Sequence, residues 1–512
     1  MRAADHLPER FNSADWFVGR HIREGRGARI ALATDDGTTT YAALDEAVRR
    51  FASALRRAGV GRDERVALVL PDGPMFAIAF WGAIAAGAVA VPLSTLLKPH
   101  DYRAIALDCT PRVVVVDPAI LDPRELDEHA ADVWTVADAR ARLDSAPPIA
   151  AYAPTHRDGF AFFLYTSGTT GEPKGVVHLQ HDMWVCCETY GTSILELTPD
   201  DRCFSVAKLF FAYGLGNALY FPFHVGATAI LYGGRPTPDA VFDQVRRHRP
   251  TLFFGVPTAY ANMLGALESG AQPGDTFASV RACASAGESL PGPVFSRWLA
   301  ATKTEILDGI GSTEICHIFL SNRSGACKPG STGLPVPGYD LRLVDETGAD
   351  VRRGELGDLL VRGDSTAALY WNKHDQTKRT IHGDWIRTGD RYSQDEDGYF
   401  FHAGRSDDMI KAGGIWVSPV EVEAALIAHA AVLECAVIGT ADTDGLLKPH
   451  AFVTLRVQAT AEAKGALEAE LKAFAKERLA PYKAPRWVTF VAELPKTATG
   501  KIQRFLLRAG AR

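Results

Sequence analysis

The sequence predicts an α/β protein with a large N-terminal region of several subdomains, in which helices flank mixed β-sheets, and a small C-terminal α+β domain. Short apolar runs rich in β-formers alternate with stretches of helical periodicity, which indicates parallel or mixed sheets covered on both faces. The chain has 512 residues. Because single cores stop growing at roughly 250 to 300 residues, we expect at least two domains.

The N-terminal elements follow from their residue patterns. Tyr41 to Ala58 has helical periodicity, and Gly59 closes it as glycine commonly closes helices. Met75 to Leu93 carries no charge and is nominally long enough to span a bilayer. Glycine and proline interrupt this run and alanine dominates it, so we expect a buried helix followed by a buried strand at Ala88 to Leu93. Further predicted strands are Arg65 to Leu70, Arg112 to Asp117, Phe160 to Tyr165 and Thr251 to Val256.

A change in residue composition near residue 400 marks the predicted domain boundary. Ser393 to Gly398 is polar and rich in aspartate and glycine, and a fresh helix and strand pattern follows. We expect an N-terminal domain over 1–404, a hinge at 405–407 and a C-terminal domain over 408–512. In the C-terminal domain the patterns predict helices at Ser418 to His429 and Thr460 to Leu479 and a strand at Ala451 to Arg456.

Composition favours small-molecule chemistry. The chain is 47% hydrophobic and 23% charged, with a formal net charge of -6, as is typical of water-soluble globular proteins. It has no long basic run, so neither nucleic acid nor an anionic membrane is an expected partner. The N-terminus lacks the pattern of a signal peptide. The eight cysteines show no CxxC spacing, which predicts buried thiols in a reducing cytoplasm.

A phosphate-binding loop is the strongest local motif. Residues 165–175 read Y-T-S-G-T-T-G-E-P-K-G directly after an apolar strand. Glycines let backbone N–H groups approach an oxyanion closely, hydroxyls donate further hydrogen bonds, and a lysine adds positive charge. The loop is not of the nucleotide-triphosphatase type G-x-x-x-x-G-K-[ST], because Gly175 follows Lys174 and the glycine spacing differs.

This loop resembles the signature S/T-S/T-G-T-T-G-x-P-K-G of the adenylate-forming superfamily, which includes acyl-CoA synthetases, peptide-synthetase adenylation domains and luciferases. Five further segments resemble motifs of that superfamily in the same order: Ser285–Glu288, Gly311–Glu314, Thr388–Asp390, Gly404–Lys411 and Pro495–Lys501. The resemblance therefore extends over residues 165 to 501. It implies the adenylate-forming enzyme fold, with a mobile C-terminal domain.

The resemblance also assigns roles to residues. It makes Lys501, Thr166, Lys174 and Glu314 the catalytic set, with Glu314 holding Mg²⁺ beside the phosphates of ATP. Asp390 accepts from the ribose hydroxyls, and Asp407 is the hinge. The residues assigned to ATP and AMP are Thr166, Ser167, Gly168, Thr169, Thr170, Gly171, Lys174, Ala286, Gly287, Glu288, Asp308, Gly309, Ile310, Thr313, Asp390 and Arg405.

The acyl pocket resembles that of benzoate-CoA ligases. The similarity lies in the runs Lys208 to Gly216 and Gly309 to Asn322. Flat apolar walls with a few polar groups suit a small aromatic acid, and Tyr213 and His317 are the expected polar contacts. The predicted lining is Phe211, Ala212, Tyr213, Gly214, Gly311, Ile315, His317 and Ile318. Benzoate, a hydroxybenzoate and an aminobenzoate all remain open, because one ring substituent changes binding by only a few kcal/mol.

Coenzyme A is the acceptor that the resemblance implies. Lys411, Gly413 and Gly414 are then expected to line its tunnel, although a glycine pair also suits a plain hairpin turn. Three rival functions stay open: an aryl adenylation enzyme that loads a carrier protein, a luciferase-like monooxygenase, and a non-catalytic binding module. The presence of both Lys174 and Lys501 speaks against the last. The sequence leaves open whether the protein forms a homodimer.

Overall fold

The computed structural model describes residues 2–126, 128–167, 173–406, 408–412, 415–442, 446–457, 460–496 and 502–510. Several predicted site residues lie outside this described part of the chain: Gly168, Thr169, Thr170, Gly171, Asp407, Gly413, Gly414 and Lys501.

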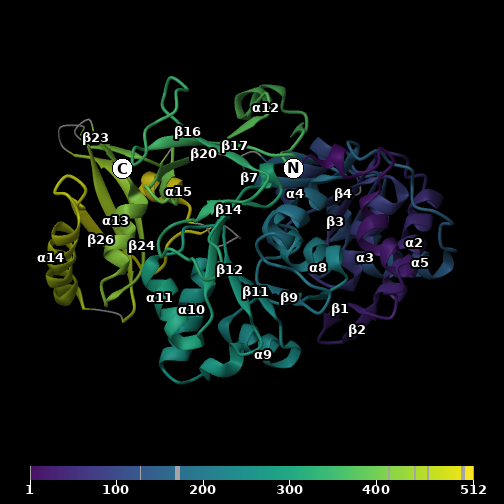
Figure 1. Ribbon diagram of the computed structural model, residues 1–512, viewed down its shortest axis with the longest axis horizontal. Coiled ribbons are helices and arrows are strands. Elements are labelled where there is room, and N and C mark those ends of the chain that lie inside the picture. Colours follow the sequence, from purple (N-terminus) through teal and green to yellow (C-terminus); the bar gives the residue numbers. More distant parts are fainter. Residues whose placement is uncertain are drawn as a thin grey trace.

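A mixed sheet in the N-terminal region has the order β18-β8-β7-β4-β3-β5-β6. Its strands β3, β4 and β7 are labelled in Figure 1. Strands β7, β4, β3, β5 and β6 run parallel, whereas β8 and β18 add an antiparallel edge. The strands are β3 (Arg65–Val69), β4 (Val89–Pro92), β5 (Val113–Val116), β6 (Asp132–Thr135), β7 (Phe160–Ser167), β8 (Pro173–Leu179) and β18 (Leu369–Tyr370). The predicted strands of this region are confirmed, and β7 extends into the phosphate motif.

A second sheet has the order β15-β14-β13-β12-β11-β9-β10-β1-β2. The strands from β13 to β1 run parallel, and both ends are antiparallel. Its strands are β1 (Ile30–Thr34), β2 (Gly37–Thr40), β9 (Arg202–Ser205), β10 (Thr228–Ile230), β11 (Leu252–Gly255), β12 (Ala282–Ser285), β13 (Ile306–Gly311), β14 (Ile318–Ser321) and β15 (Leu334–Pro335). The carboxyl ends of β12 and β13 therefore meet at one edge, where α/β proteins commonly bind ligands.

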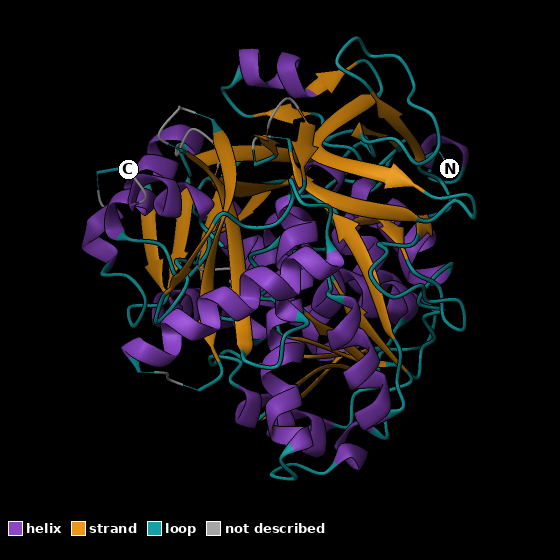
Figure 2. Ribbon diagram, turned by 90° about the vertical axis from the view of Figure 1, so that its left-hand side faces the viewer, coloured by secondary structure: helices purple, strands orange, loops and turns teal. Residues whose placement is uncertain are grey.

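Helices pack against these sheets (Figure 2). The α-helices are α1 (Arg20–Arg23), α2 (Tyr41–Arg57), α3 (Pro74–Ala86), α4 (Pro99–Cys109), α5 (Val136–Ser145), α6 (Asp182–Cys186), α7 (Ala212–Leu215), α8 (Phe221–Val225), α9 (Pro238–His248), α10 (Pro257–Glu268), α11 (Gly292–Thr302) and α12 (His374–Thr380). Short 3-10 segments are η1 (Ala3–Asp5), η3 (Pro123–Leu126), η6 (Gly274–Phe277) and η7 (Thr313–Ile315), and π-helical segments are η2 (Asp15–Gly19), η4 (Cys187–Thr192) and η5 (Gly216–Tyr220).

The predicted helix after residue 41 and the apolar helix after it pack against each other. The hydroxyl of Thr40 accepts from the backbone N–H of Ala43 and caps the start of α2. A Cβ at Gly82 of α3 would lie 2.6 Å from the Phe51 ring of α2, so the glycine allows a close approach. Helix α3 is buried and leads into β4, as predicted. Among the described residues, none of the helices has both the length and the apolarity needed to cross a bilayer.

A five-stranded antiparallel sheet follows, with the order β16-β17-β20-β19 and β21 paired to β20. Its strands are β16 (Asp340–Val344), β17 (Gly357–Arg362), β19 (Ile381–His382), β20 (Trp385–Gln394) and β21 (Phe400–Arg405). The polar stretch Ser393 to Gly398 contains the turn between β20 and β21, so it belongs to this sheet. Strand β21 runs one residue past the predicted boundary, and Arg405 pairs with Asp390.

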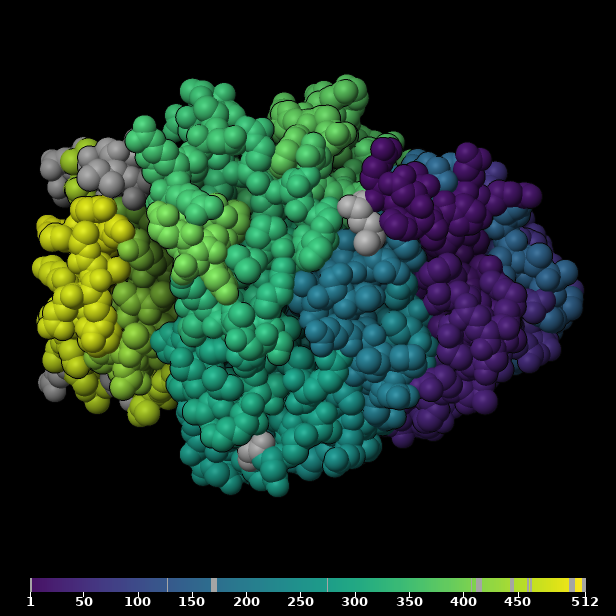
Figure 3. Space-filling model, in the orientation of Figure 1, coloured from purple at the N-terminus to yellow at the C-terminus, as the bar shows by residue number. Residues whose placement is uncertain are grey.

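The C-terminal elements form one end of the molecule (Figures 1 and 3). A β-hairpin of β22 (Ile410–Ala412) and β23 (Ile415–Val417) precedes a sheet of β24 (Val432–Ala441), β25 (Leu447–Leu455) and β26 (Trp487–Phe490). The helices are α13 (Pro419–Ile427), α14 (Ala461–Arg478) and α15 (Arg504–Gly510). This part has an apolar core of its own, and the predicted helices and strand are confirmed.

All eight cysteines are free thiols. Seven are buried, and Cys327 is partly buried. Burial raises the pKa of Cys109, Cys283 and Cys327 to about 12. The prediction of buried, unpaired thiols therefore holds for the whole set except the half-buried Cys327.

Candidate active site

The β7–β8 hairpin brings both ends of the predicted phosphate loop together. Thr166 lies opposite Lys174, and Ser167 lies opposite Pro173. The ring of Tyr165 packs so close to Gly175 that a Cβ there would lie 3.0 Å from Tyr165 Cζ. The hydroxyl of Tyr165 donates to Asp108 Oδ2 at 2.6 Å, which fixes the ring. A hydroxyl residue and a lysine thus stand side by side at the mouth of the loop.

Tyr370 connects Lys174 to Glu314. The ammonium of Lys174 lies 5.6 Å from the centre of the Tyr370 ring, within reach of a cation–π contact. The Tyr370 hydroxyl donates to Glu314 Oε1 at 2.8 Å, and the N–H of Ala367 donates to the Glu314 carbonyl at 2.7 Å. Burial and the Glu314 carboxylate raise the pKa of Tyr370, which keeps the hydroxyl a donor. The cation and the carboxylate of two separate motifs therefore share one aromatic neighbour.

The predicted acyl-pocket residues meet around His317. Its Nε2 contacts the Tyr213 carbonyl at 3.3 Å, and its ring packs against aromatic rings of η4, α7, η5 and α8: Tyr190, Tyr213, Tyr220 and Phe221. Burial lowers the pKa of His317 to about 3, so the imidazole is neutral. Among the described residues, His317 Nδ1 and the Tyr213 hydroxyl have no hydrogen-bond partner. Such buried polar atoms suit a polar ligand.

Glycines set the spacing of this cluster. A Cβ at Gly216 would lie 2.4 Å from His317 Cδ2, and one at Gly311 would lie 2.5 Å from the His317 carbonyl oxygen. Cys316, just before His317, has a φ of 72°, a strained value for a side-chain-bearing residue. The other predicted lining residues lie on the same segments: Phe211 and Ala212 are half-buried, and Gly214, Ile315 and Ile318 are buried.

The predicted adenine-side loop follows β12 beside Asp308. Ser285 pairs with Asp308 across β12 and β13, and Ala286 is buried. Gly287 has a φ of 95°, which turns the chain away from the sheet. Burial raises the pKa of Asp308 well above its ordinary value. Its Oδ1 has no hydrogen-bond partner in the described part of the chain, so one oxygen of this buried carboxyl is left without a protein donor at the end of the strand.

Asp390 and Arg405 form a second polar group on the five-stranded sheet. The guanidinium Nη1 of Arg405 donates to Asp390 Oδ1 at 3.1 Å and to the Thr388 carbonyl at 2.9 Å. Gly389 has a φ of 77°, and a Cβ there would lie 2.7 Å from Arg405 Nη2. Burial acts to raise the pKa of Asp390, but the contacts with His402 and Arg405 outweigh it and hold that pKa below its ordinary value. The carboxylate is therefore charged.

Comparison with protein families decides what this arrangement belongs to. Residues 20–371 match the AMP-binding enzyme family, and residues 421–501 match the C-terminal domain of AMP-binding enzymes. The chain belongs to the AMP-binding enzyme family.

Individual AMP-binding enzymes are similar over almost the whole chain. A benzoate–CoA ligase of Thauera aromatica is 48% identical, with 99% of each chain covered. A 4-hydroxybenzoate–CoA/benzoate–CoA ligase of Rhodopseudomonas palustris is 46% identical, over 97% of this chain and 94% of its own. The crystal structure of the anthranilate CoA ligase AuaEII in complex with anthranoyl-AMP is 40% identical, covers 100% and 99% of the two chains, and superposes with a TM-score of 0.95.

In the C-terminal part of this AMP-binding enzyme, the structure describes Lys411 and residues next to the predicted hinge and catalytic lysine. Lys411 pairs with Trp416 in the β22–β23 hairpin, next to the glycine pair. Asp408 forms ion pairs with Arg504 and Arg508 of α15. Lys496 and Ile502 form a β-bridge on either side of 497–501. The described residues on either side of 413–414 and of 497–501 thus pair with each other in the C-terminal part.

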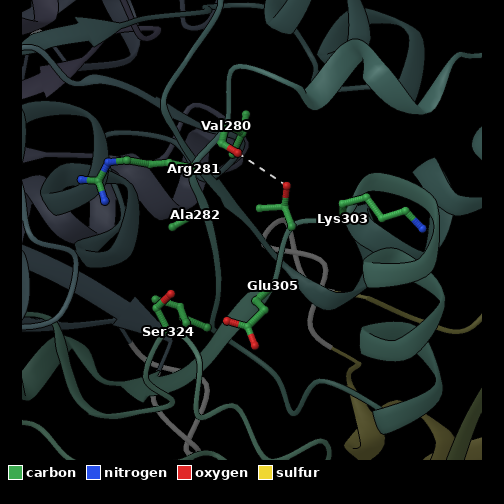
Figure 4. A pocket seen from close by; sticks show the side chains of 8 residues that line it. Val280, Arg281, Ala282, Lys303, Glu305 and Ser324 are labelled. Carbon is green, nitrogen blue, oxygen red and sulfur yellow. Dashed lines mark hydrogen bonds between the residues drawn. The ribbon is translucent and has the colours of Figure 1, made fainter.

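A polar hollow of about 350 Å³ lies away from these groups (Figure 4). It is lined by Val280, Arg281, Ala282, Lys303, Thr304, Glu305, Leu307 and Ser324. These residues gather at the amino ends of β12 and β13, whereas Ser285 and Asp308 lie toward the carboxyl ends. The hollow is therefore on the opposite edge of the sheet from the candidate site.

Sequence reasoning missed three residues of the candidate site. They are Tyr370, which holds Glu314; His178, whose Nε2 contacts the Thr313 carbonyl at 2.7 Å; and His402, which contacts Ser289 and Asp390. Each acts across a long sequence separation and stands in a segment without a motif of its own. Their only sequence signal is residue type, which does not point to a partner.

Proposed function

We propose that this protein is an aryl-CoA ligase that uses ATP to convert a benzoate-type acid to its CoA thioester, releasing AMP and pyrophosphate. The observation that carries the proposal is the near full-length similarity to a benzoate–CoA ligase, joined to the aromatic cluster around His317. That cluster presents two polar atoms within apolar walls, as expected for a small aromatic ligand.

The first step joins two anions. A carboxylate oxygen of the acid attacks the α-phosphorus of ATP, and pyrophosphate leaves with the bonding electrons. We assign Thr166 and Lys174 to stabilising charge on the phosphates, and their opposite positions on β7 and β8 support this assignment. We assign Lys501 to bridging the carboxylate and α-phosphate, which lowers the repulsion between them. Asp390 and Arg405 hold the ribose, and Asp308 lies on the adenine side.

Glu314 fits the magnesium ion that such a reaction uses. Mg²⁺ bound to ATP takes one or two protein carboxylates, with water and phosphate as its other ligands. Tyr370 holds Glu314 Oε1 beside Lys174. The described residues contain no cluster of three or more His, Cys, Asp or Glu that could hold a metal ion. The ion supplies charge neutralisation at the phosphates.

The second step transfers the acyl group to sulfur. The CoA thiolate attacks the carbonyl carbon of the adenylate, and AMP leaves through its phosphate oxygen. We assign Lys411, Gly413 and Gly414 to the CoA tunnel. We further propose domains over 1–404 and 408–512 with a hinge at 405–407 that centres on Asp407, because the second step needs access where Lys501 stood.

The acid is a benzoate that carries either no ring substituent or one small one. The three relatives described above bear names that specify benzoate, 4-hydroxybenzoate or anthranilate, so the pocket type admits all three. His317 and Tyr213 contribute a neutral imidazole and a hydroxyl, which fix the orientation of the ring without demanding a charge on it. We propose no nucleic acid or membrane partner and a cytoplasmic location; a homodimer stays open.

A second function has support from one group of relatives. p-Hydroxybenzoic acid–AMP ligases of Mycobacterium are 33% identical, and the match spans 65% of their length. An aryl adenylation enzyme that loads a carrier protein would use the same nucleotide residues. The distinguishing property is whether free CoA accepts the acyl group.

The test is release of AMP and pyrophosphate from ATP with a panel of acids. The panel contains benzoate, hydroxybenzoates, aminobenzoates, phenylacetate and octanoate, each with and without CoA. We expect CoA-dependent turnover on one benzoate. Adenylate formation without CoA turnover would favour the carrier-protein function, and inactivity with every acid would refute the assignment of the acyl pocket.

A further inference from the structure

His402 lies between two segments that the nucleotide assignments treat separately. Its Nδ1 lies 2.6 Å from the Ser289 hydroxyl, which directly follows the adenine-side loop 285–288. Its Nε2 lies 3.6 Å from Asp390 Oδ1 on the neighbouring strand. One imidazole therefore spans the gap between the loop after β12 and the carboxylate of β20.

Neighbouring groups determine the position of the His402 ring and which of its nitrogens carries the hydrogen. His402 pairs with Tyr392 across β21 and β20, and the two ring centres are 5.1 Å apart. A carboxylate accepts hydrogen bonds and cannot donate, so the nitrogen that faces Asp390 carries the hydrogen. In the neutral ring Nδ1 is then the acceptor, and the Ser289 hydroxyl donates to it. The Ser289 hydroxyl thus donates to His402, and the opposite ring nitrogen faces Asp390 at 3.6 Å, a polar contact that is longer than a hydrogen bond.

Two groups face one carboxylate oxygen: Arg405 donates a hydrogen bond to it, and His402 makes a longer polar contact. Arg405 Nη1 lies 3.1 Å from Asp390 Oδ1, the same oxygen that His402 faces. Asp390 is 7% exposed, so its carboxylate is held among protein groups rather than by solvent. A carboxylate that is fixed through one oxygen presents its other oxygen in a set direction, which is what recognition of a diol requires.

We propose that His402 is a positioning residue that, with Ser289, orients Asp390 toward the ribose and ties this carboxylate to the adenine-side loop. The inference rests on the proposed role of Asp390 in ribose binding. It predicts that the imidazole matters for ATP only through the ribose hydroxyls. A residue with a purely structural role would affect every nucleotide alike.

The test compares binding of ATP and of 2′,3′-dideoxy-ATP to the full chain, with Mg²⁺ and without an acid, by titration calorimetry. We expect the wild type to bind ATP at least about tenfold more tightly than 2′,3′-dideoxy-ATP. Each hydrogen bond from a ribose hydroxyl to the charged Asp390 contributes that much affinity or more. His402→Phe keeps the ring and removes both nitrogens. This variant should lower the affinity for ATP about tenfold. It should change the affinity for 2′,3′-dideoxy-ATP by less than about twofold.

Two variants sharpen the result. His402→Gln should recover most of the preference for ATP, because its amide can donate to Asp390 and accept from Ser289. His450→Phe is the matched control: His450 also lies between two hydroxyls, of Thr440 and Thr489, and stacks on an aromatic ring, but it lies in the C-terminal sheet. It should leave both affinities unchanged.

Each outcome decides a different statement. Equal weakening of both nucleotides in His402→Phe would overturn the positioning role while leaving the ribose assignment of Asp390 in place. Equal affinity of the wild type for both nucleotides would overturn that assignment and the inference with it. Failure of the wild type to bind ATP at all would refute the proposed function itself.

Discussion

At the scale of single residues, the candidate acyl pocket depends on a glycine, which leaves space for a neighbouring ring. The His317 ring is enclosed by four aromatic rings. It occupies the space that a side chain at position 216 would fill, and Gly216 leaves that space open. Interiors are close-packed, so a methyl group placed there has to displace the ring. The pocket is thus sensitive to a change in a residue that carries no chemistry.

Gly216→Ala should therefore weaken binding of the aromatic acid and leave binding of ATP unchanged. The new Cβ would lie 2.4 Å from His317 Cδ2, and overpacking of this kind costs about 1 to 3 kcal/mol. We expect KM for the preferred benzoate to rise about tenfold or more, with KM for ATP within about twofold. Steady-state kinetics measure both. Gly265→Ala is the control, because a Cβ in that helix meets nothing within 4 Å; equal effects of the two variants would contradict the prediction.

A buried histidine at the N-terminal end sets a pH prediction. Burial lowers the pKa of His21 to about 3, against 6.5 in an unfolded chain. Below pH 6.5 the unfolded chain takes up a proton that the folded chain does not, so this residue's contribution to stability is complete above pH 6.5 and is lost as the pH falls toward 3. The loss amounts to about 1.4 kcal/mol per pH unit within that window.

His21→Gln should flatten the fall of Tm between pH 6.5 and 4. Glutamine can keep the contacts with the Phe223 carbonyl and with Arg26 Nε but cannot be protonated. Differential scanning fluorimetry at several pH values measures the slope. A variant whose Tm falls as steeply as that of the wild type would show that His21 is not a source of acid sensitivity.

At the scale of elements, α15 is held by charge to α13 and to the segment before β22. Arg504 donates to both oxygens of Glu423, at 2.7 and 2.9 Å, and Glu423 accepts from the Val437 N–H at 2.7 Å. Arg504 also pairs with Asp408 at 3.7 Å. This network joins α13, β24 and the residue next to the predicted hinge to the helix that follows the predicted catalytic lysine.

Arg504→Gln should loosen these elements together. Removing one partner of a buried ion pair leaves an uncompensated charge and costs about 3 kcal/mol or more. We expect amide hydrogen exchange in β24 and α13 to quicken about 100-fold, while exchange in the seven- and nine-stranded sheets is unchanged. Arg478→Gln, at an exposed arginine stacked on Phe474, is the control. Unchanged exchange in Arg504→Gln would mean that the pair contributes little.

Sequence patterns predicted the elements better than the contacts between them. Runs such as Val113–Val116 become strands because β-branched residues suit a buried pleated surface. The π-helical segments were not predicted, since one extra residue in a helical turn leaves no mark in an apolar pattern. The polar stretch Ser393 to Gly398 indicated a nearby domain boundary in the sequence, whereas in the structure it contains the turn between β20 and β21, because turns inside a sheet and boundaries between domains favour the same residues.

For the candidate site too, some residues could be predicted from the sequence and others could not. Thr166 and Lys174 could be predicted because the backbone of one loop brings them together. Tyr370 and His402 could not, since their contacts with Glu314 and Ser289 span 56 and 113 residues. Contacts of that kind follow from tertiary packing, which a local pattern does not encode.

At the scale of the whole molecule, the proposed residues come from every part of the chain. Thr166 belongs to the first sheet, Asp308 to the second, Asp390 to the third and Lys411 to the C-terminal hairpin. A reaction in two steps can then use different combinations of these parts. We expect adenylation and thioester formation to depend on different faces of the C-terminal part.

Lys501→Ala and Gly414→Trp should separate the two steps. The first variant should abolish adenylation and leave transfer of a supplied aryl adenylate to CoA largely intact, because the lysine bridges two anions only in the first step. The second should do the reverse, by blocking the proposed tunnel. Pyrophosphate exchange and thioester formation from synthetic adenylate measure the steps one at a time. Equal loss of both activities in both variants would refute the alternation of domains.

The burial of the cysteines has a consequence for an enzyme whose proposed co-substrate is itself a thiol. Oxidised CoA attaches to proteins by exchange with a thiolate, which must be both ionised and accessible. Seven of the eight cysteines are buried, the eighth is partly buried, and three of them have a pKa raised to about 12. The seven buried thiols are thereby shielded from forming mixed disulfides with the oxidised form of the proposed co-substrate.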